Sequence, residues 1–291
     1  MKIKTNIKKI AYILVINLVM LATVILTSCG NSENSISVIT REEGSGTRSA
    51  FVELFGVEEN KVDSTTDTAV VSNSTENAIQ SVVNDDGAIG YISLGSLKDD
   101  IKAIKIDGVE PTVDNVKSGE YKIVRPFNIV VNKNKKSDAV QDFINYILSG
   151  SGQDVVKQAG YVTLDKTNDF TTTNPSGKIT ISGSSSVSPV MEKLIEGYNS
   201  INQNLKIELQ TLDSTSGINN SINGVSDIGM ASRDLKESEL NQGVEEQKIA
   251  QDGLAVIVNK NNSVNNLTKE QVKDIFTGKV DSWDDVENNS K

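Results

Sequence analysis

The sequence contains no histidine and only one cysteine among its 291 residues. Without histidine, Ser-His-Asp and Cys-His catalysis and histidine-ligated metal sites are excluded. Walker A and GxSxG strings are also absent, so P-loop nucleotide binding and the hydrolase elbow are not expected. A single cysteine excludes an internal disulfide. Aromatic residues make up only 4% of the chain, which predicts a core of valine, isoleucine and leucine.

The first 29 residues have the pattern of a secretory signal. Four lysines lie within the first nine residues, an apolar run covers residues 10–26, and Leu-Thr-Ser-Cys ends the segment at Cys29. These last four residues match a bacterial lipobox, in which the cysteine becomes the lipidated first residue. We therefore expect an extracytoplasmic protein, anchored to the outer face of the bacterial cell membrane by a lipid on Cys29. The alternative is a single transmembrane anchor, since the run is almost long enough to span a bilayer.

The rest of the chain is strongly acidic. Residues 1–29 hold four lysines and no acid, so their removal leaves 25 basic against 39 acidic residues, a net charge of −14. This balance does not favour nucleic acid or an anionic membrane as a partner. The remaining length, roughly 260 residues, suits two domains of ordinary size.

Short apolar strands alternate with helical segments in both halves of the chain, which predicts an α/β fold with mainly parallel sheets. Residues 166–178 are rich in Thr, Asn, Pro and Gly and form the best internal linker. The sequences of residues 127–136, FNIVVNKNKK, and 254–263, LAVIVNKNNS, resemble each other. Either two short strands are similar by chance, or they are matching strands that cross between two lobes at a hinge.

Three Ser/Thr/Gly clusters follow predicted strands and precede predicted helices, at residues 44–47, 184–187 and 214–217. A helix start offers unpaired N–H groups and a partial positive charge, and Ser, Thr and Gly add donors and close backbone approach. The alternative for any one cluster is an ordinary N-cap. Three clusters, with Arg41 before one and Arg233 after a further strand, predict a small tetrahedral oxyanion held by several helix starts.

The strings REEGSGTR, SGSSSVSP and DIGMASR together closely resemble the phosphate-binding lipoproteins of bacterial phosphate ABC transporters. The resemblance extends over nearly all of the chain after the signal, including AIGYISLGSL and LTKEQVKDIFTGKVDSWDDV. It implies a two-lobed type II periplasmic-binding-protein fold, a clamshell with two β-strand crossovers. Such a protein captures inorganic phosphate and delivers it to ABC permease subunits. It makes and breaks no covalent bond, so we expect a binding protein rather than an enzyme. We also expect a monomer, with no cofactor and no metal.

The order of the segments differs from that family. There, the segment resembling residues 178–286 precedes the one resembling 36–164, so this chain resembles a circular permutant that opens between Trp283 and Ile36. We then expect a continuous lobe I over 125–258, containing the linker, and a lobe II assembled from 36–120 plus 261–291. The chain end must lie close to Ile36. The rival interpretation is a fusion of partial gene copies that pairs with a second copy by swapping.

The resemblance also implies the residues that contact phosphate, four in lobe II and four in lobe I: Arg41, Ser45, Gly46 and Thr47, and Ser186, Val187 through its N–H, Ser214 and Ser232. Arg41 is the expected charged clamp; alternatively it forms a surface ion pair with Glu42 or Glu43.

Arg48 and Arg233 are weaker candidates for phosphate contacts, because either could instead join the lobes through salt bridges. Some family members have an aspartate where Arg233 stands. Glu43, or as second choice Glu42, is therefore the candidate acceptor for the proton of hydrogen phosphate, which sulfate lacks at neutral pH. Two other functions stay open, a binding protein for another anion (sulfate, molybdate or a small organic anion) and a non-transport anion sensor or adhesion protein.

Overall fold

The computed structural model describes residues 34–60 and 62–288. The predicted signal peptide and the predicted lipidation site, Cys29, lie outside these residues. From Ile36 onward the chain forms one compact unit, and only this unit is considered below. In the part of the chain that the structure describes, no helix is both long enough and apolar enough to cross a membrane.

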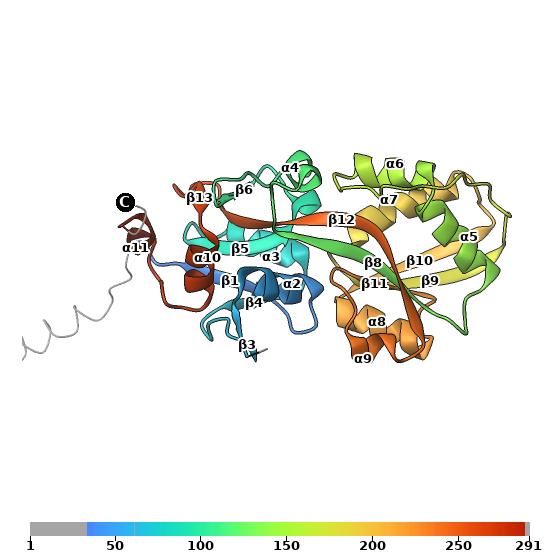
Figure 1. Ribbon diagram of the computed structural model, residues 1–291, viewed down its shortest axis with the longest axis horizontal. Helices are drawn as coiled ribbons and strands as arrows, with labels where there is room; N and C mark the ends of the chain where they lie inside the picture. Colours follow the sequence, from blue (N-terminus) through green and yellow to red (C-terminus); the bar gives the residue numbers. More distant parts are fainter. Residues whose placement is uncertain (1–33, 61, 289–291) are drawn as a thin grey trace, which may run out of the picture. The chain divides into compact units, whose positions relative to one another are not determined.

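One nine-stranded sheet runs through the molecule (Figure 1). Its strands follow the order β10 (Leu205–Leu212), β9 (Gly177–Ser184), β11 (Ile228–Ala231), β8 (Val124–Asn132), β12 (Val244–Asn259), β5 (Ala88–Ser93), β1 (Ser37–Arg41) and β4 (Val70–Ser72), with β6 (Ile101–Ala103) beside β12. The outer strands pair in parallel, whereas β8 and β12 run antiparallel to their neighbours. The predicted α/β fold is confirmed.

The remaining elements flank this sheet. Two small sheets pair β2 (Glu58–Glu59) with β3 (Val62–Asp63) and β7 (Lys105–Ile106) with β13 (Asn266–Leu267). The helices are α2 (Gly46–Phe55), α3 (Thr75–Val83), η1 (Leu94–Ser96), α4 (Val113–Ser118), α5 (Asp138–Ile147), α6 (Gly150–Gln158), α7 (Ser188–Asn199), α8 (Ser214–Asn223), α9 (Glu237–Leu240), α10 (Lys269–Phe276) and α11 (Trp283–Asn288).

Two large cores define two lobes, which β8 and β12 join (Figure 1). Valine, isoleucine and leucine fill most of both cores, as the composition predicts. The few aromatic rings nevertheless lie inside the cores: Phe51 stacks on Tyr91 in one lobe at 3.9 Å between ring centroids, and Phe143 meets Tyr198 edge-on in the other at 5.2 Å. We call the part containing Phe51 lobe II (36–123 and 254–288) and the part containing Phe143 lobe I (124–253).

The second crossing between the lobes occurs inside β12. Residues Val244–Gly253 of this strand pair with β8, whereas Leu254–Val258 pair with β5 and contribute to the core of lobe II. The boundary predicted from the sequence, at residue 258, lies beyond this crossing. By their pairing with β5, residues Leu254–Val258 belong to lobe II. An apolar strand has the same composition on either side of such a crossing, which is why the repeat of residues 127–136 and 254–263 could not locate it.

A buried ion pair ties the two crossing segments together. Arg125 of β8 and Asp252 of β12 are register partners, with 3.0 Å between Arg125 Nε and Asp252 Oδ2, and both are at most 3% exposed. Ser93 of lobe II donates to the other carboxylate oxygen at 2.9 Å. Burial raises the pKa of Asp252 to about 6 against the opposing effect of Arg125. Because an unpaired buried charge is costly, this pair favours the observed register of the two crossing segments.

The two ends of the described chain are neighbours. The backbone N–H of Ile36 donates to the carbonyl of Asp281 at 2.8 Å, and Trp283 Nε1 donates to the carbonyl of Gly87 at 3.0 Å. This proximity is what a permuted order requires, because the new ends must lie where neighbouring residues once were joined. The permutation itself stays a prediction.

One buried carboxylate contributes much of the hydrogen bonding between the linker, residues 166–178, and the helices of lobe I. Asp142 of α5 accepts hydrogen bonds from Thr172 Oγ1 at 2.8 Å and from the backbone N–H and Oγ1 of Thr173 at 2.8 and 2.9 Å. Tyr198 OH of α7 donates to the same group at 2.6 Å. Burial favours the neutral acid, but these hydrogen bonds outweigh it and lower the pKa of Asp142.

We expect Asp142→Asn to reduce the free energy of unfolding by about 2 kcal/mol at pH 7, since hydrogen bonds to a charged group are lost. A carboxyl whose pKa is lower in the folded state stabilises above its unfolded pKa, and this stabilisation disappears as the pH falls through the folded pKa. The variant should therefore lose less stability on acidification than the native chain. Urea unfolding at several pH values measures both effects. Asp138→Asn, an exposed position on the same helix, is the control, and its stability should change little. If Asp142→Asn and the native chain lost stability equally on acidification, Asp142 would not be the group that stabilises the fold through these hydrogen bonds.

Candidate anion-binding site

Four helices begin where strands of the large sheet end, two in each lobe. In lobe II, α2 follows β1 and α3 follows β4; in lobe I, α7 follows β9 and α8 follows β10. Ser45, Ser74 and Asp213 cap three of them through side-chain bonds to the backbone N–H groups of the first turn. Such helix starts carry partial positive charge and free donors, so their meeting point suits an anion.

Hydroxyl groups from these helix starts meet across the lobes. Thr47 Oγ1 of lobe II lies 2.8 Å from Ser186 Oγ of lobe I, although 139 positions separate the two residues. Thr75 Oγ1 lies 3.1 Å from Ser186 Oγ, and its backbone N–H donates to Ser185 Oγ at 3.2 Å. We call the group the hydroxyl cluster; its members, each at most 8% exposed, are Thr47, Thr75, Ser184, Ser185, Ser186, Ser214 and Ser232.

The remaining members of the hydroxyl cluster surround the start of α2. Ser184 Oγ donates to Ser232 Oγ at 3.0 Å, and the backbone N–H of Ser232 donates to Ser214 Oγ at 3.1 Å. A Cβ added to Gly46 would lie closer than 3.0 Å to both Ser214 Oγ and Ser232 Oγ. The first turn of α2 therefore reaches the hydroxyls of the opposite lobe only because residue 46 has no side chain.

Arg41 brings the positive charge into this cluster. Its side chain is 2% exposed and donates from Nη1 to Thr75 Oγ1 at 3.3 Å and from Nη2 to Ser185 Oγ at 3.0 Å. Nε and Nη2 also donate to the two carboxylate oxygens of Glu42, both at 2.8 Å. The ion pair considered as an alternative thus exists with Glu42, but it is largely buried and holds the guanidinium beside the cluster.

Other predicted residues have different surroundings. Ser45 Oγ caps α2 by accepting from the backbone N–H of Arg48 at 3.3 Å. The side chain of Val187 is buried in the core of lobe I, and its N–H donates to the carbonyl of Ser184 at 3.0 Å. Glu43 is exposed and lines the cavity described below.

The two other arginines form ion pairs inside single lobes. Arg48 pairs with Asp63 at 2.6 Å within lobe II, and Arg233 pairs with Glu239 at 2.8 Å within lobe I. The interpretation that these arginines join the lobes through salt bridges is therefore not what the structure shows. Arg48 Nη1 instead donates to the carbonyl of Arg41 at 2.9 Å, which supports the strand end that carries the clamp.

Thr75, Ser184 and Ser185 were not among the predicted site residues, although the structure places them in the hydroxyl cluster. Ser184 and Ser185 belong to a cluster that it did identify, but Thr75 follows a strand of three residues in the string SNST. That string carries the same Ser/Thr signature as the other helix starts, which marks Thr75 as the start of a helix but does not place it opposite Ser185.

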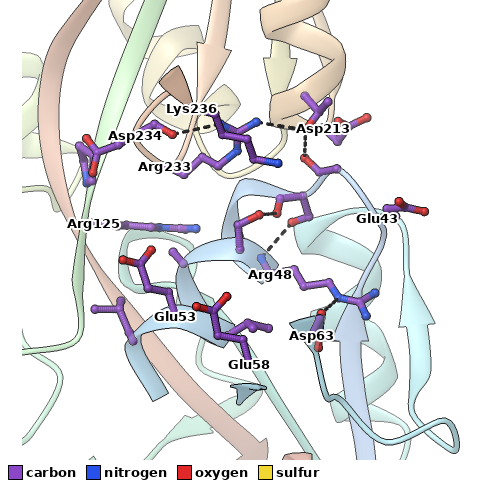
Figure 2. A pocket seen from close by; sticks show the side chains of 18 of the residues that line it. Glu43, Arg48, Glu53, Glu58, Asp63, Arg125, Asp213, Arg233, Asp234 and Lys236 are labelled. Carbon is purple, nitrogen blue, oxygen red and sulfur yellow. Dashed lines mark hydrogen bonds and ion pairs between the residues drawn. The ribbon is translucent and has the colours of Figure 1, made fainter. Parts of the chain in front are cut away.

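A cavity of about 1060 Å³ adjoins the site and is lined by both lobes (Figure 2). Gly44 and Ser45 of the α2 start line it together with Thr215 and Asp213 of the α8 start. Its walls carry both signs of charge, with Arg48, Glu53, Glu58 and Asp63 from lobe II facing Arg125, Arg233, Asp234 and Lys236 from lobe I.

Two α/β lobes, two crossing segments between them and helix starts that face one another define a two-lobed substrate-binding protein. A family model described as a PBP superfamily domain matches residues 25–151 and 169–291. The chain belongs to this superfamily.

Its relatives include named phosphate-binding proteins. The chain is 51% identical over 272 residues to the phosphate-binding protein PstS 2 of Streptococcus agalactiae serotype V, covering 90% of this chain and 93% of the relative. It is 41% identical over 274 residues to PstS 2 of Streptococcus pneumoniae serotype 4, covering 90% and 94%. The crystal structure of a phosphate ABC transporter phosphate-binding protein from Streptococcus pneumoniae TIGR4 has 42% identity and a TM-score of 0.69, and the match covers 87% of this chain and 99% of that one.

Proposed function

We propose that this protein captures inorganic phosphate between its two lobes and delivers it to an ABC permease. The observation that carries the proposal is the hydroxyl cluster, which combines donors from both lobes with the guanidinium of Arg41 at one buried point. A tetrahedral oxyanion removed from water needs many donors around it, and hydroxyls, helix N–H groups and one arginine supply them.

Binding would couple to closure because the donors come from opposite lobes. Thr47 and Ser186, which contact each other in the closed arrangement, would each donate to an oxygen of phosphate. A ligand that contacts both lobes at once favours the closed state over the open one. The acidic surface opposes phosphate at long range, so the affinity must come from short hydrogen bonds in the buried site.

We also propose a role for each predicted site residue and a location for the protein. The anion contacts Val187 through its backbone N–H, together with Arg41, Ser45, Gly46, Thr47, Ser186, Ser214 and Ser232. Glu43, or as second choice Glu42, accepts its proton. The protein acts as an extracytoplasmic monomer with a lipid on Cys29, and it catalyses no reaction. The permuted order is supported by the hydrogen bond between Ile36 and Asp281, which brings the proposed new ends together.

Isothermal titration calorimetry with phosphate, in the presence and absence of excess sulfate at two pH values, tests this function. We expect phosphate to bind with one site per chain and sulfate not to compete at either pH, because a carboxylate acceptor would face sulfate without a shared proton. Equal competition by sulfate would indicate a general oxyanion-binding protein, and no heat with phosphate would overturn the proposal. Restored phosphate uptake in cells lacking their own binding protein would test delivery to a permease.

A further inference from the structure

A further contact between the lobes lies outside the hydroxyl cluster, between the starts of α2 and α8. The carbonyl oxygen of Gly44, in the loop before α2, accepts two hydrogen bonds from Thr215 in the first turn of α8. The backbone N–H and Oγ1 of Thr215 both donate at 3.1 Å. Gly44 belongs to lobe II and Thr215 to lobe I, and both line the charged cavity beside the site. The lobes are thus joined here by atoms that are not part of the anion site.

The hydroxyl of Thr215 is oriented by a buried arginine. Arg233 Nη2 donates to Thr215 Oγ1 at 3.2 Å, while Nη1 and Nη2 each donate to one carboxylate oxygen of Glu239 at 2.8 Å. Arg233 and Glu239 are 6% and 8% exposed. A guanidinium can only donate, so the hydroxyl accepts from Arg233 and its single proton points to the carbonyl of Gly44.

Gly44, which accepts the hydrogen bonds from Thr215, is also held in one conformation. Gly44 has φ of +89°, a conformation that favours glycine, and a Cβ there would lie 2.7 Å from Asp213 Oδ1. Asp213 is held as the cap of α8, because it accepts from the backbone N–H of Ser216 at 2.8 Å. The carbonyl of Gly44 can therefore approach α8 closely only with glycine at this position.

We propose that Thr215, oriented by the Arg233–Glu239 pair, is a positioning residue that keeps the lobes closed and so slows release of the anion. The identity of that anion as phosphate rests on the proposed function. Thr215 acts on the closed state alone, because its partner Gly44 is within reach only when the lobes meet. Its loss should therefore raise the dissociation rate and leave the association rate nearly unchanged.

Thr215→Val removes the hydroxyl and keeps the backbone N–H and the side-chain shape. We expect phosphate to dissociate about tenfold faster, equivalent to about 1.4 kcal/mol, in stopped-flow measurements, with association changed by less than about twofold. Thr215→Ser should restore the native rate, because it restores the hydroxyl. Thr211→Val is the matched control: its hydroxyl bonds to Ser188 within lobe I at 2.9 Å, so both rates should stay native.

Small-angle scattering without added anion separates this inference from the proposed function. The radius of gyration of Thr215→Val should exceed that of the native chain and of Thr211→Val, whether or not phosphate is the ligand. If the native chain binds no phosphate, the proposed function fails while the scattering comparison still tests Thr215. Native dissociation rate and native radius in Thr215→Val would overturn the inference. So would a Thr215→Ser variant that behaves like Thr215→Val, or a Thr211→Val variant that opens equally.

Discussion

Arg41→Ala is expected to weaken phosphate binding by two to four orders of magnitude, while the variant still folds and unfolds cooperatively. Two effects add. The hydroxyl cluster loses the guanidinium that donates to Thr75 and Ser185, and Glu42 keeps a largely buried negative charge beside the incoming anion with its partner removed. Truncating one member of a buried charge pair costs about 3–5 kcal/mol, which gives the expected range. Titration calorimetry measures the affinity, and circular dichroism with urea unfolding measures the fold.

Two further variants divide the effect of Arg41→Ala into its parts. Glu42→Gln combined with Arg41→Ala removes the unpaired charge as well, so it should regain part of the lost affinity. Arg48→Ala removes a nearby arginine whose side chain bonds to Asp63 and to the carbonyl of Arg41. It should lower the affinity by less than about tenfold, far less than Arg41→Ala does. Native affinity in Arg41→Ala, or an equal loss in Arg48→Ala, would place the anion elsewhere.

Much of the site could be predicted from sequence because its chemistry is local. A strand that ends in Ser, Thr or Gly and continues as a helix fixes the position of free N–H groups and hydroxyls without knowledge of the fold. In the structure, Thr47 lies against Ser186, and Gly46 lies against Ser214 and Ser232, all of them predicted as site residues. The α/β fold class could likewise be predicted, because apolar strands alternate with helical segments along the chain.

Long-range partners could not be predicted in this way. Thr75 follows β4, an edge strand of three residues in which Val70 and Val71 are 52% and 59% exposed, so no buried apolar run marks it. Its place in the site depends on Ser185, which is 110 positions away. The N–H of Val187 was predicted as a phosphate donor from the resemblance alone. Its hydrogen bond to the Ser184 carbonyl depends on the geometry of the turn before α7, which the sequence does not give.

Tertiary pairing also decided the extent of β12. Only residues 254–258 have the apolar pattern of a strand, yet β12 begins at Val244 with the polar string VEEQK. This polar half pairs with β8 and has a register shift between Lys248 and Ala250. A partner strand supplies backbone hydrogen bonds whatever the side chains are, so the composition of one strand does not give its length.

Gly46→Ala is the second change with a large expected effect, a loss of phosphate affinity of about two orders of magnitude without loss of stability. The added Cβ would lie closer than 3.0 Å to Ser214 Oγ and Ser232 Oγ of the opposite lobe. Either these hydroxyls turn away from the anion or the lobes stay apart, and both outcomes weaken binding. Alanine instead of glycine at a helical position adds about 0.4–1 kcal/mol of stability by restricting the unfolded chain. Thermal unfolding without phosphate should therefore occur at the native temperature or above it, and added phosphate should raise that temperature much less than in the native chain.

Gly150→Ala is the matched control for this result. Gly150 is also the first residue of a helix, it also follows a serine N-cap, Ser149, and the nearest atom to an added Cβ is Thr167 Oγ1 at 3.9 Å. The same gain in stability is expected there, with native phosphate affinity and a native rise in unfolding temperature. Since the two substitutions differ mainly in what lies opposite the new methyl group, native affinity in Gly46→Ala would show that closure does not bring α2 against Ser214 and Ser232.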